Sequence, residues 1–299
     1  MKKALIIIIT TAMMLCGCAH AAAPAQIAAT TLPVYEFTAR LCEDTPLTVA
    51  RLVTEEVSCL HDYSLNVNQV KAAEAAELIV CSGAGLEEFL DDILLNAQII
   101  DASTGIELLA AEGHHHDHSH GHEEGNHTEE AHHHEQDPHI WLSPANARDM
   151  AFNIWEGLCS AYPEHTERFT ENLWCLSDEL DALALYGHQQ LKDLSCRELI
   201  TFHDGFAYLA DAFELTILDA IEEESGSEAS AGELIHMIEE VEHHDLPAIF
   251  TEKSGSVSAA GIIARETGAT AYVLDMAMAG DSYFDAMYRN IDTLKEALQ

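Results

Sequence analysis

The chain has 299 residues, enough for one large domain or two of ordinary size. It carries 13 lysines and arginines against 52 aspartates and glutamates, which gives a formal net charge of −39 at pH 7. A nucleic-acid duplex needs clustered positive charge on its protein partner, so this composition argues against nucleic-acid binding. An acidic surface is suited instead to solubility and to the attraction of cations.

The first residues are expected to be a targeting segment rather than part of the fold. Two lysines precede an apolar run over 4–15, which is too short to span a membrane as a helix. The run ends at Leu15-Cys16-Gly17-Cys18, which resembles the lipobox of bacterial lipoproteins. This resemblance predicts a signal peptide over 1–17, lipidation of Cys18 and a tether over 18–26. The alternative is an ordinary secretory signal that is cleaved near residues 21–23.

Short apolar or β-branched runs alternate with helix-compatible segments in both halves of the chain. Strands that alternate with helices indicate parallel β-α-β units, so we predict two similar α/β lobes, each with a four-stranded parallel sheet. The expected strands are 27–31, 47–53, 77–82 and 98–101, followed by 198–202, 214–219, 247–251 and 270–274.

The middle of the chain has the strongest helix signals. Ser143 and Pro144 fit the N-cap and the first position of a helix, and apolar residues then recur at helical spacing to residue 162. Pro163 interrupts this pattern, and leucines continue it over 164–194, a helix roughly 45 Å long. We interpret this helix as a rigid strut between the lobes; a long surface helix within one domain is the alternative. The expected organisation is therefore a first lobe over 27–162, a linking helix over 163–195 and a second lobe over 196–299.

Six cysteines follow the targeting segment, and in an exported protein they either form disulfides or remain as buried thiols. None of them is arranged as CxxC, so a zinc site built from thiolates is poorly supported. They are Cys42, Cys59, Cys81, Cys159, Cys175 and Cys196.

Residues 113–136 form a low-complexity segment in which ten histidines are mixed with acidic residues. No large apolar residue would anchor it, so a mobile loop is expected. Neutral imidazole binds Zn²⁺, Cu²⁺ and Ni²⁺, which favours an accessory metal-binding role over a solvated linker. The histidines are His114, His115, His116, His118, His120, His122, His127, His132, His133 and His134.

Four residues outside this segment are the candidate metal ligands. His203 and Asp275 each follow an expected strand, at the edge where open α/β sheets bind their ligands. His61 comes after the second strand, and His139 lies just before the helix that Ser143 caps. Three imidazoles and one carboxylate make a full tetrahedral set for Zn²⁺. Five other histidines are expected on exposed helix faces or at helix ends: His165, His188, His236, His243 and His244.

Several stretches resemble the metal-binding solute receptors of ABC importers, the ZnuA/TroA-like family. They are DPHIWLSP at 137–144, FHDGF at 202–206, and LD at 274–275 with YFDAMYRN at 283–290. The resemblance implies two α/β lobes joined by one long helix, with the metal in the cleft between the lobes. A stiff connecting helix predicts small lobe adjustments on binding rather than a wide closure.

Carried over by position, the metal ligands of the family fall on His61, His139, His203 and Asp275. Receptors of the zinc branch have His at the third position, where manganese receptors have Glu, and a His-rich insertion between the first two ligands is typical of the zinc branch. The family's usual Pro-His pair and Glu-Pro are absent around His61, which leaves Asp62 or Glu56 as alternatives for the contact in the first lobe. Asp62 and Asp204 are expected to orient imidazoles.

The resemblance further implies a monomeric, extracytoplasmic lipoprotein that captures Zn²⁺ and delivers it to an ABC permease driven by an ATPase. A receptor for manganese or another divalent metal is the nearest alternative. A surface zinc buffer or adhesin that works through the His-rich segment is a second. A zinc hydrolase is a third, but such an enzyme keeps an open metal position for water, and the sequence has no HExxH or GxSxG motif.

Overall fold

The computed structural model describes residues 25–55, 57, 60, 63–90, 97–110, 136–220, 229–253 and 257–299. The predicted lipidation site Cys18, the candidate ligand His61 and the histidines of the low-complexity segment lie outside these residues. So do Glu56 and Asp62, the proposed alternatives to His61.

Two four-stranded sheets form the framework, and every strand pair in them is parallel. The strand orders are β2-β1-β3-β4 and β6-β5-β7-β8, so the two halves of the chain repeat one topology. This arrangement confirms the predicted α/β fold class. The strands are β1 (Ile27–Ala29), β2 (Val49–Arg51), β3 (Leu78–Cys81), β4 (Gln98–Asp101), β5 (Glu198–Thr201), β6 (Thr216–Ala220), β7 (Ala248–Glu252) and β8 (Thr270–Leu274).

Several of the helices that connect the strands begin at a side-chain cap. Ser143 accepts a hydrogen bond from the Asn146 amide at the start of α4, as the Ser143-Pro144 pair predicts. Asn66 and Ser230 each form a capping box at the start of α2 and α7. The helices are α1 (Leu32–Leu41), α2 (Val67–Ala75), α4 (Pro144–Ala161), α5 (Thr166–Leu191), α6 (Ala207–Ala212), α7 (Ala231–His243), α8 (Val257–Thr267) and α9 (Tyr283–Leu298), with short 3₁₀ turns η1 (Glu88–Leu90), η2 (Ile140–Leu142) and η3 (Pro163–His165).

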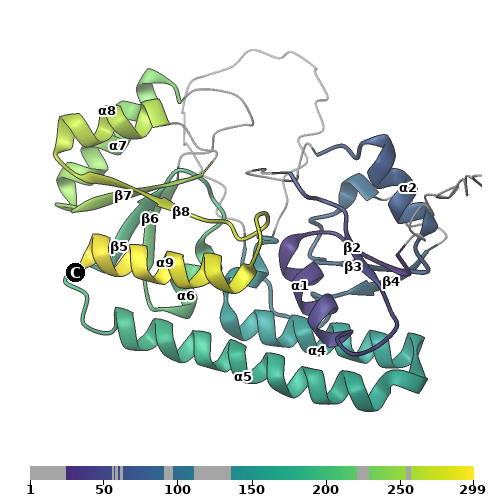
Figure 1. Cartoon of the computed structure of the whole chain (residues 1–299). Coiled ribbons are helices and arrows are strands. Elements are labelled where there is room, and N and C mark those ends of the chain that lie inside the picture. Colours follow the sequence, from purple (N-terminus) through teal and green to yellow (C-terminus); the bar gives the residue numbers. More distant parts are fainter. Residues whose placement is uncertain are drawn as a thin grey trace, which may run out of the picture.

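The long helix α5 runs along the base of the molecule, with α4 beside it, beneath both sheets (Figure 1). It has 26 residues and follows directly on η3, so the predicted strut is present, about 39 Å long. Its buried face also contacts α1 from the first half and α9 from the second. The strut is therefore packed against both halves along its length.

A second connection joins the halves above the strut, through the segment between β8 and α9. The indole of Trp141 donates a hydrogen bond to the Met276 carbonyl (2.8 Å), and the Tyr283 hydroxyl donates one to the Trp141 carbonyl (2.8 Å). The Leu32 amide donates to the Met278 carbonyl (3.1 Å), and the Tyr283 amide to the Glu36 carboxylate (2.6 Å). We call these contacts the interlobe joint. Trp141 and Tyr283 are fully buried in one apolar core that includes residues of both sheets.

The five cysteines that the structure describes, at 42, 81, 159, 175 and 196, are all free thiols. Burial raises the pKa of the Cys42 thiol to about 12, and it raises that of Cys81 well above its ordinary value. These two thiols are consequently inert core residues. The structure thus supports free thiols rather than disulfides at these five positions, although Cys175 is exposed and not buried.

The first sheet buries a carboxyl group beyond the ends of its central strands β1 and β3. Glu87 accepts hydrogen bonds from the Thr30 hydroxyl (2.6 Å) and from the amides of Ser82 (2.7 Å) and Gly83 (3.0 Å). Desolvation outweighs these bonds and raises the pKa of Glu87 from 4.5 to about 7. The folded state thus retains a proton that the unfolded chain releases as pH rises above 4.5.

Glu87 should make the free energy of unfolding fall between pH 4.5 and 7, by up to about 3 kcal/mol. Glu87→Gln cannot ionise and should remove this part of the pH dependence in urea unfolding. Exposed Glu88→Gln serves as the control and should keep the wild-type profile. Equal profiles for Glu87→Gln and the wild type would contradict this assignment.

Tyr283→Phe should lower the free energy of unfolding by about 1–3 kcal/mol, because it leaves the buried Trp141 carbonyl without its donor. Tyr186→Phe removes a comparable hydroxyl bond, to Asp292, on the exposed surface and should cost about 0.5 kcal/mol or less. The midpoints of urea unfolding, compared at an unchanged m-value, give the loss of stability in each variant. An equal loss of stability in the two variants would show that the buried hydrogen bond of the interlobe joint stabilises the protein no more than an exposed one.

Candidate metal centre

His139 lies at the start of η2 and is almost completely buried, with 1% of its surface exposed. One carboxylate oxygen of Asp137 accepts hydrogen bonds from the His139 amide (2.8 Å) and from ring atom Nδ1 (2.7 Å). An ionised carboxylate only accepts, so Nδ1 carries the ring proton. In the neutral imidazole, the lone pair is therefore on Nε2.

The Nε2 atom of His139 is buried and has no hydrogen-bond partner among the described residues. A buried acceptor without a partner is costly, and native proteins satisfy nearly all of them. Metal-binding histidines commonly donate their second ring N–H to a carboxylate, which is the arrangement that Asp137 provides. The chemistry of His139 thus fits a metal ligand that coordinates through Nε2.

His203 lies next to His139, directly beyond the end of β5. The two imidazole rings are 5.3 Å apart between centroids and nearly perpendicular, at 86°. Gly205 allows this position, because a Cβ atom there would lie 2.8 Å from Cδ2 of His203 and 2.8 Å from Cε of Met276. The structure therefore brings together two of the four predicted ligands.

Asp275 follows β8, and its backbone and side chain are both held in place. The Asp275 amide donates a hydrogen bond to the side-chain oxygen of Asn290 (2.8 Å), and the side-chain amide of Asn290 donates one to the Asp275 carbonyl (2.7 Å). The Ala277 amide donates to oxygen Oδ1 of the Asp275 carboxylate (2.9 Å). The other oxygen, Oδ2, is paired with Lys253 (2.7 Å) and Arg289 (3.3 Å). Two cations thus contact the carboxylate that was predicted to bind a metal.

A small cavity of about 10 Å³, room for roughly one water molecule, lies beside Asp275. Val57 of the first half contributes to its lining, and the remaining residues come from the second half. Glu252 at the end of β7 is one of them, a buried carboxylate that the sequence reasoning did not single out. The cavity is lined by Val57, Glu252, Lys253, Asp275, Met276, Met278 and Ala279.

The predicted ligands are only partly assembled in the described part of the chain. The ligand atoms of His139, His203 and Asp275 do not all come within 4.8 Å of one another there. His61 lies outside the described residues, so its role stays a prediction, as does that of Asp62. Asp137 was missed as the partner of His139, although its place two residues earlier in Asp137-Pro138-His139 was a usable signal.

The described residues on either side of the His-rich segment lie close to His139. Ala110 and Gln136 form an antiparallel bridge, and the Asp137 amide donates to the Leu109 carbonyl (2.9 Å). The Tyr208 hydroxyl accepts from the Leu109 amide and donates to the Asp137 carbonyl, both at 2.9 Å. The chain before the segment is thus paired with the chain at its end, three residues before His139.

Comparison with known families gives a match over almost the whole described fold. The model of the ZnuA family, described as zinc-uptake complex component A, periplasmic, matches residues 27–297. A putative metal-binding protein of Treponema pallidum is 30% identical over 247 residues, covering 79% of this chain and 76% of that protein. The zinc-binding lipoprotein AdcA of Streptococcus pneumoniae serotype 4 is 28% identical, covering 99% of this chain. This chain spans only 61% of that AdcA and 55% of AdcA from Streptococcus pyogenes.

Solved structures agree with the fold. A crystal structure of ZnuA has a TM-score of 0.77 at 28% identity and covers 92% of this chain and 100% of its own. The laminin-binding protein Lmb of Streptococcus agalactiae, described as a bifunctional adhesin with metal-transporting activity, has a TM-score of 0.76 at 23% identity, with the same coverage. FpvC of P. aeruginosa, solved with Ni²⁺, has a TM-score of 0.74 at 23% identity and covers 91% of this chain and 96% of its own. At 23% identity the last two support the fold alone.

His139 should carry its proton on Nδ1 in the metal-free protein, which ¹⁵N NMR of the imidazole reports directly. Asp137→Ala removes the acceptor that fixes this tautomer, so a mixture of tautomers is expected and Zn²⁺ affinity should fall about 10- to 100-fold. Asp219→Ala, whose carboxylate contacts His236 instead, is the control. A proton on Nε2 in the unaltered protein would refute the assignment.

Proposed function

Since the chain belongs to the ZnuA family of periplasmic zinc-uptake components, we propose that it is an extracytoplasmic receptor that captures Zn²⁺ and delivers it to an ABC permease. Members of this family are solute-binding proteins and not enzymes, which removes the hydrolase alternative. The observation that carries the proposal is the buried Nε2 atom of His139. Asp137 sets the tautomer of this imidazole, and the His203 ring lies beside it.

In this proposal, the metal is held between the two halves by His139 and His203, with Asp275 and His61 completing a tetrahedral set. Asp275 binds the ion by exchanging its contacts with Lys253 and Arg289 for the metal. These two cations neutralise the carboxylate in the empty receptor, so that it need not remain as a bare charge near the cleft. Breaking the pairs costs free energy, which lowers the affinity and assists release.

Zinc is the proposed cargo for a chemical reason. Three imidazoles suit zinc, whereas Mn²⁺ prefers more oxygen ligands. The relatives named AdcA are described as zinc-binding, which agrees with this choice. Manganese or nickel remains the alternative cargo, and Cu²⁺ would bind such a site more tightly than Zn²⁺, so selectivity depends on metal supply and on the permease.

Little movement of the halves is expected when the metal binds. The helix α5 packs against both halves, and the interlobe joint ties the segment after β8 to α1 and η2. Both connections would have to be repacked in a wide hinge closure. Capture therefore proceeds through local side-chain exchange at Asp275 and small adjustments of the lobes.

Membrane attachment in this proposal is through a lipid on Cys18. The relative from Streptococcus pneumoniae is described as a lipoprotein, which supports it. Within the described residues, none of the helices combines the length and apolar character that crossing a membrane requires. The permease and its ATPase are the partners that the family implies, and a monomeric receptor is expected.

The His-rich segment is proposed to collect zinc and pass it to the cleft. The residues that flank it, Ala110 and Gln136, pair with each other close to Asp137 and His139 in the chain, which supports this role. Imidazoles at this density increase the local metal concentration near the entrance. The tight site itself is expected to be independent of the segment.

Replacing residues 113–135 with a short glycine linker should lower zinc stoichiometry and leave one tight site in calorimetric titration. In that background, His203→Ala should weaken the tight site by more than about tenfold, because a ligand is lost. His188→Ala, on the surface of α5 away from the site, is the matched control and should change nothing.

Unchanged binding in His203→Ala would refute the cleft site. Disappearance of the tight site in the linker variant would move the function to the His-rich segment and favour the zinc-buffer alternative. Circular dichroism of each variant distinguishes a lost ligand from a lost fold.

A further inference from the structure

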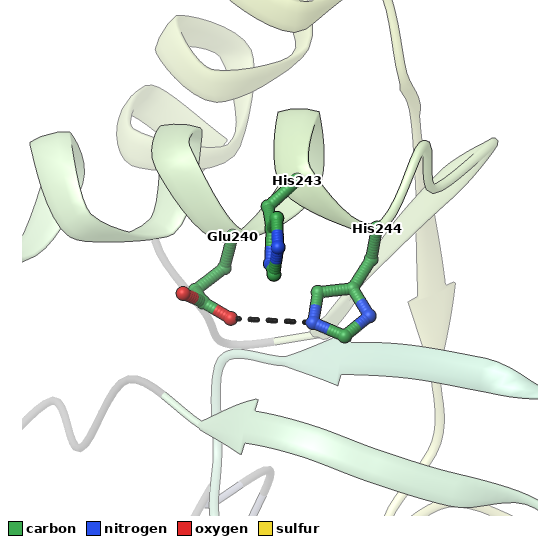
Figure 2. A group of neighbouring side chains, drawn as sticks. All are labelled: Glu240, His243 and His244. Atoms are coloured by element: carbon green, nitrogen blue, oxygen red, sulfur yellow. Dashed lines mark ion pairs between the residues drawn. The ribbon is translucent and has the colours of Figure 1, made fainter.

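A cluster of potential metal ligands lies at the C-terminal end of α7, away from the cleft. Glu240, His243 and His244 each offer one ligand atom, and these atoms all lie within 4.8 Å of one another. Figure 2 shows the three side chains converging from the last turn of the helix. The sequence alone predicts only exposed helix positions for His243 and His244.

The spacing explains why the side chains meet. Residues three and four positions apart share one face of a helix, so Glu240 lies beside both histidines. The Glu240 carboxylate is 3.7 Å from Nε2 of His244. The rings of His243 and His244 are 4.9 Å apart between centroids and nearly perpendicular. Two imidazoles and one carboxylate therefore face a common point.

A fourth residue orients the cluster from another element. Glu198, the first residue of β5, contacts Nδ1 of His244 at 3.1 Å. With the Nδ1 proton donated to this carboxylate, the lone pair of His244 is on Nε2, on the side that faces Glu240. This is the same carboxylate–imidazole arrangement that Asp137 provides for His139, and metal sites use it to fix the ligand ring.

The surroundings also favour a cation. The carbonyl end of a helix carries a partial negative charge, which stabilises positive ions in the last turn. The cluster is partly exposed, with 27% of the His244 side chain and 30% of the Glu240 side chain accessible. An ion can thus reach it from solvent and complete its coordination with water.

We propose that Glu240, His243 and His244 form a second divalent-metal site, with Glu198 as the residue that positions His244. Three protein ligands of this type suit Zn²⁺, and Ni²⁺ or Cu²⁺ by the same chemistry. The site is separate from the cleft: Glu198 begins β5 and His203 lies beyond its other end, so the strand alone separates them by about 10 Å at 3.3 Å per residue. It binds more weakly than the cleft, because it is exposed and has only three protein ligands.

The test is Zn²⁺ titration of the chain with residues 113–135 replaced by the linker, whose ends the Ala110–Gln136 bridge holds together. A second, weaker zinc equivalent is expected, and His243→Ala should weaken it by more than about tenfold. Glu198→Ala should weaken it by about tenfold or more through loss of orientation, and ¹⁵N NMR should show the His244 tautomer changed. His236→Ala, on the same helix and paired with Asp219, is the matched control.

His203→Ala separates this proposal from the cleft receptor, because it should weaken the tight equivalent and leave the affinity of the second one unchanged. A single zinc equivalent in the unaltered background, or a second one that survives His243→Ala, would overturn the second site. Loss of only the weaker equivalent in His243→Ala, with the tight one retained, would establish it whatever the role of the cleft.

Discussion

The hydrogen bonds of the interlobe joint fix the two halves of the molecule relative to each other. Trp141 stands between the halves: its indole bonds the Met276 carbonyl, and its own carbonyl receives the Tyr283 hydroxyl. Both rings are completely buried, so these bonds form in an environment that cannot replace them with water. The joint therefore fixes the segment after β8 relative to η2. Residues of η2 and of the segment after β8 can therefore form one site, because the joint sets the distance between these two segments.

The interlobe joint positions His139 and Asp275 relative to each other. His139 lies two residues before Trp141, and Asp275 immediately precedes Met276, so the same hydrogen bond sets the position of both. The strut α5 supports the joint from below through α1 and α9. In the proposed receptor, the protein framework is consequently rigid, and the adaptable part is the carboxylate of Asp275, which is shared by Lys253 and Arg289 until a metal arrives.

Local patterns account for what the sequence predicted well. The strands, the cap at Ser143 and the long helix after Pro163 depend on periodicity and turn chemistry, which neighbouring residues encode. Contacts between distant residues were not predictable in this way: the bond from Trp141 to Met276 spans 135 residues, and that of Lys253 with Asp275 joins two strand ends. The Glu240, His243 and His244 cluster had a local signal, the i, i+3, i+4 spacing, but its orienting residue Glu198 comes from another element.

The most direct measurement is a crystal structure of the chain grown with Zn²⁺, in which anomalous scattering locates the ions. We predict a peak at coordination distance from Nε2 of both His139 and His203, about 2.0–2.1 Å, with Asp275 turned from Lys253 toward the metal and the joint at Trp141 unchanged. Absence of zinc at His139 would contradict the proposed cleft site. An ion there accompanied by rupture of the Trp141 to Met276 bond would contradict the role of the joint, because the halves would then be assembled by the metal and not by the fold.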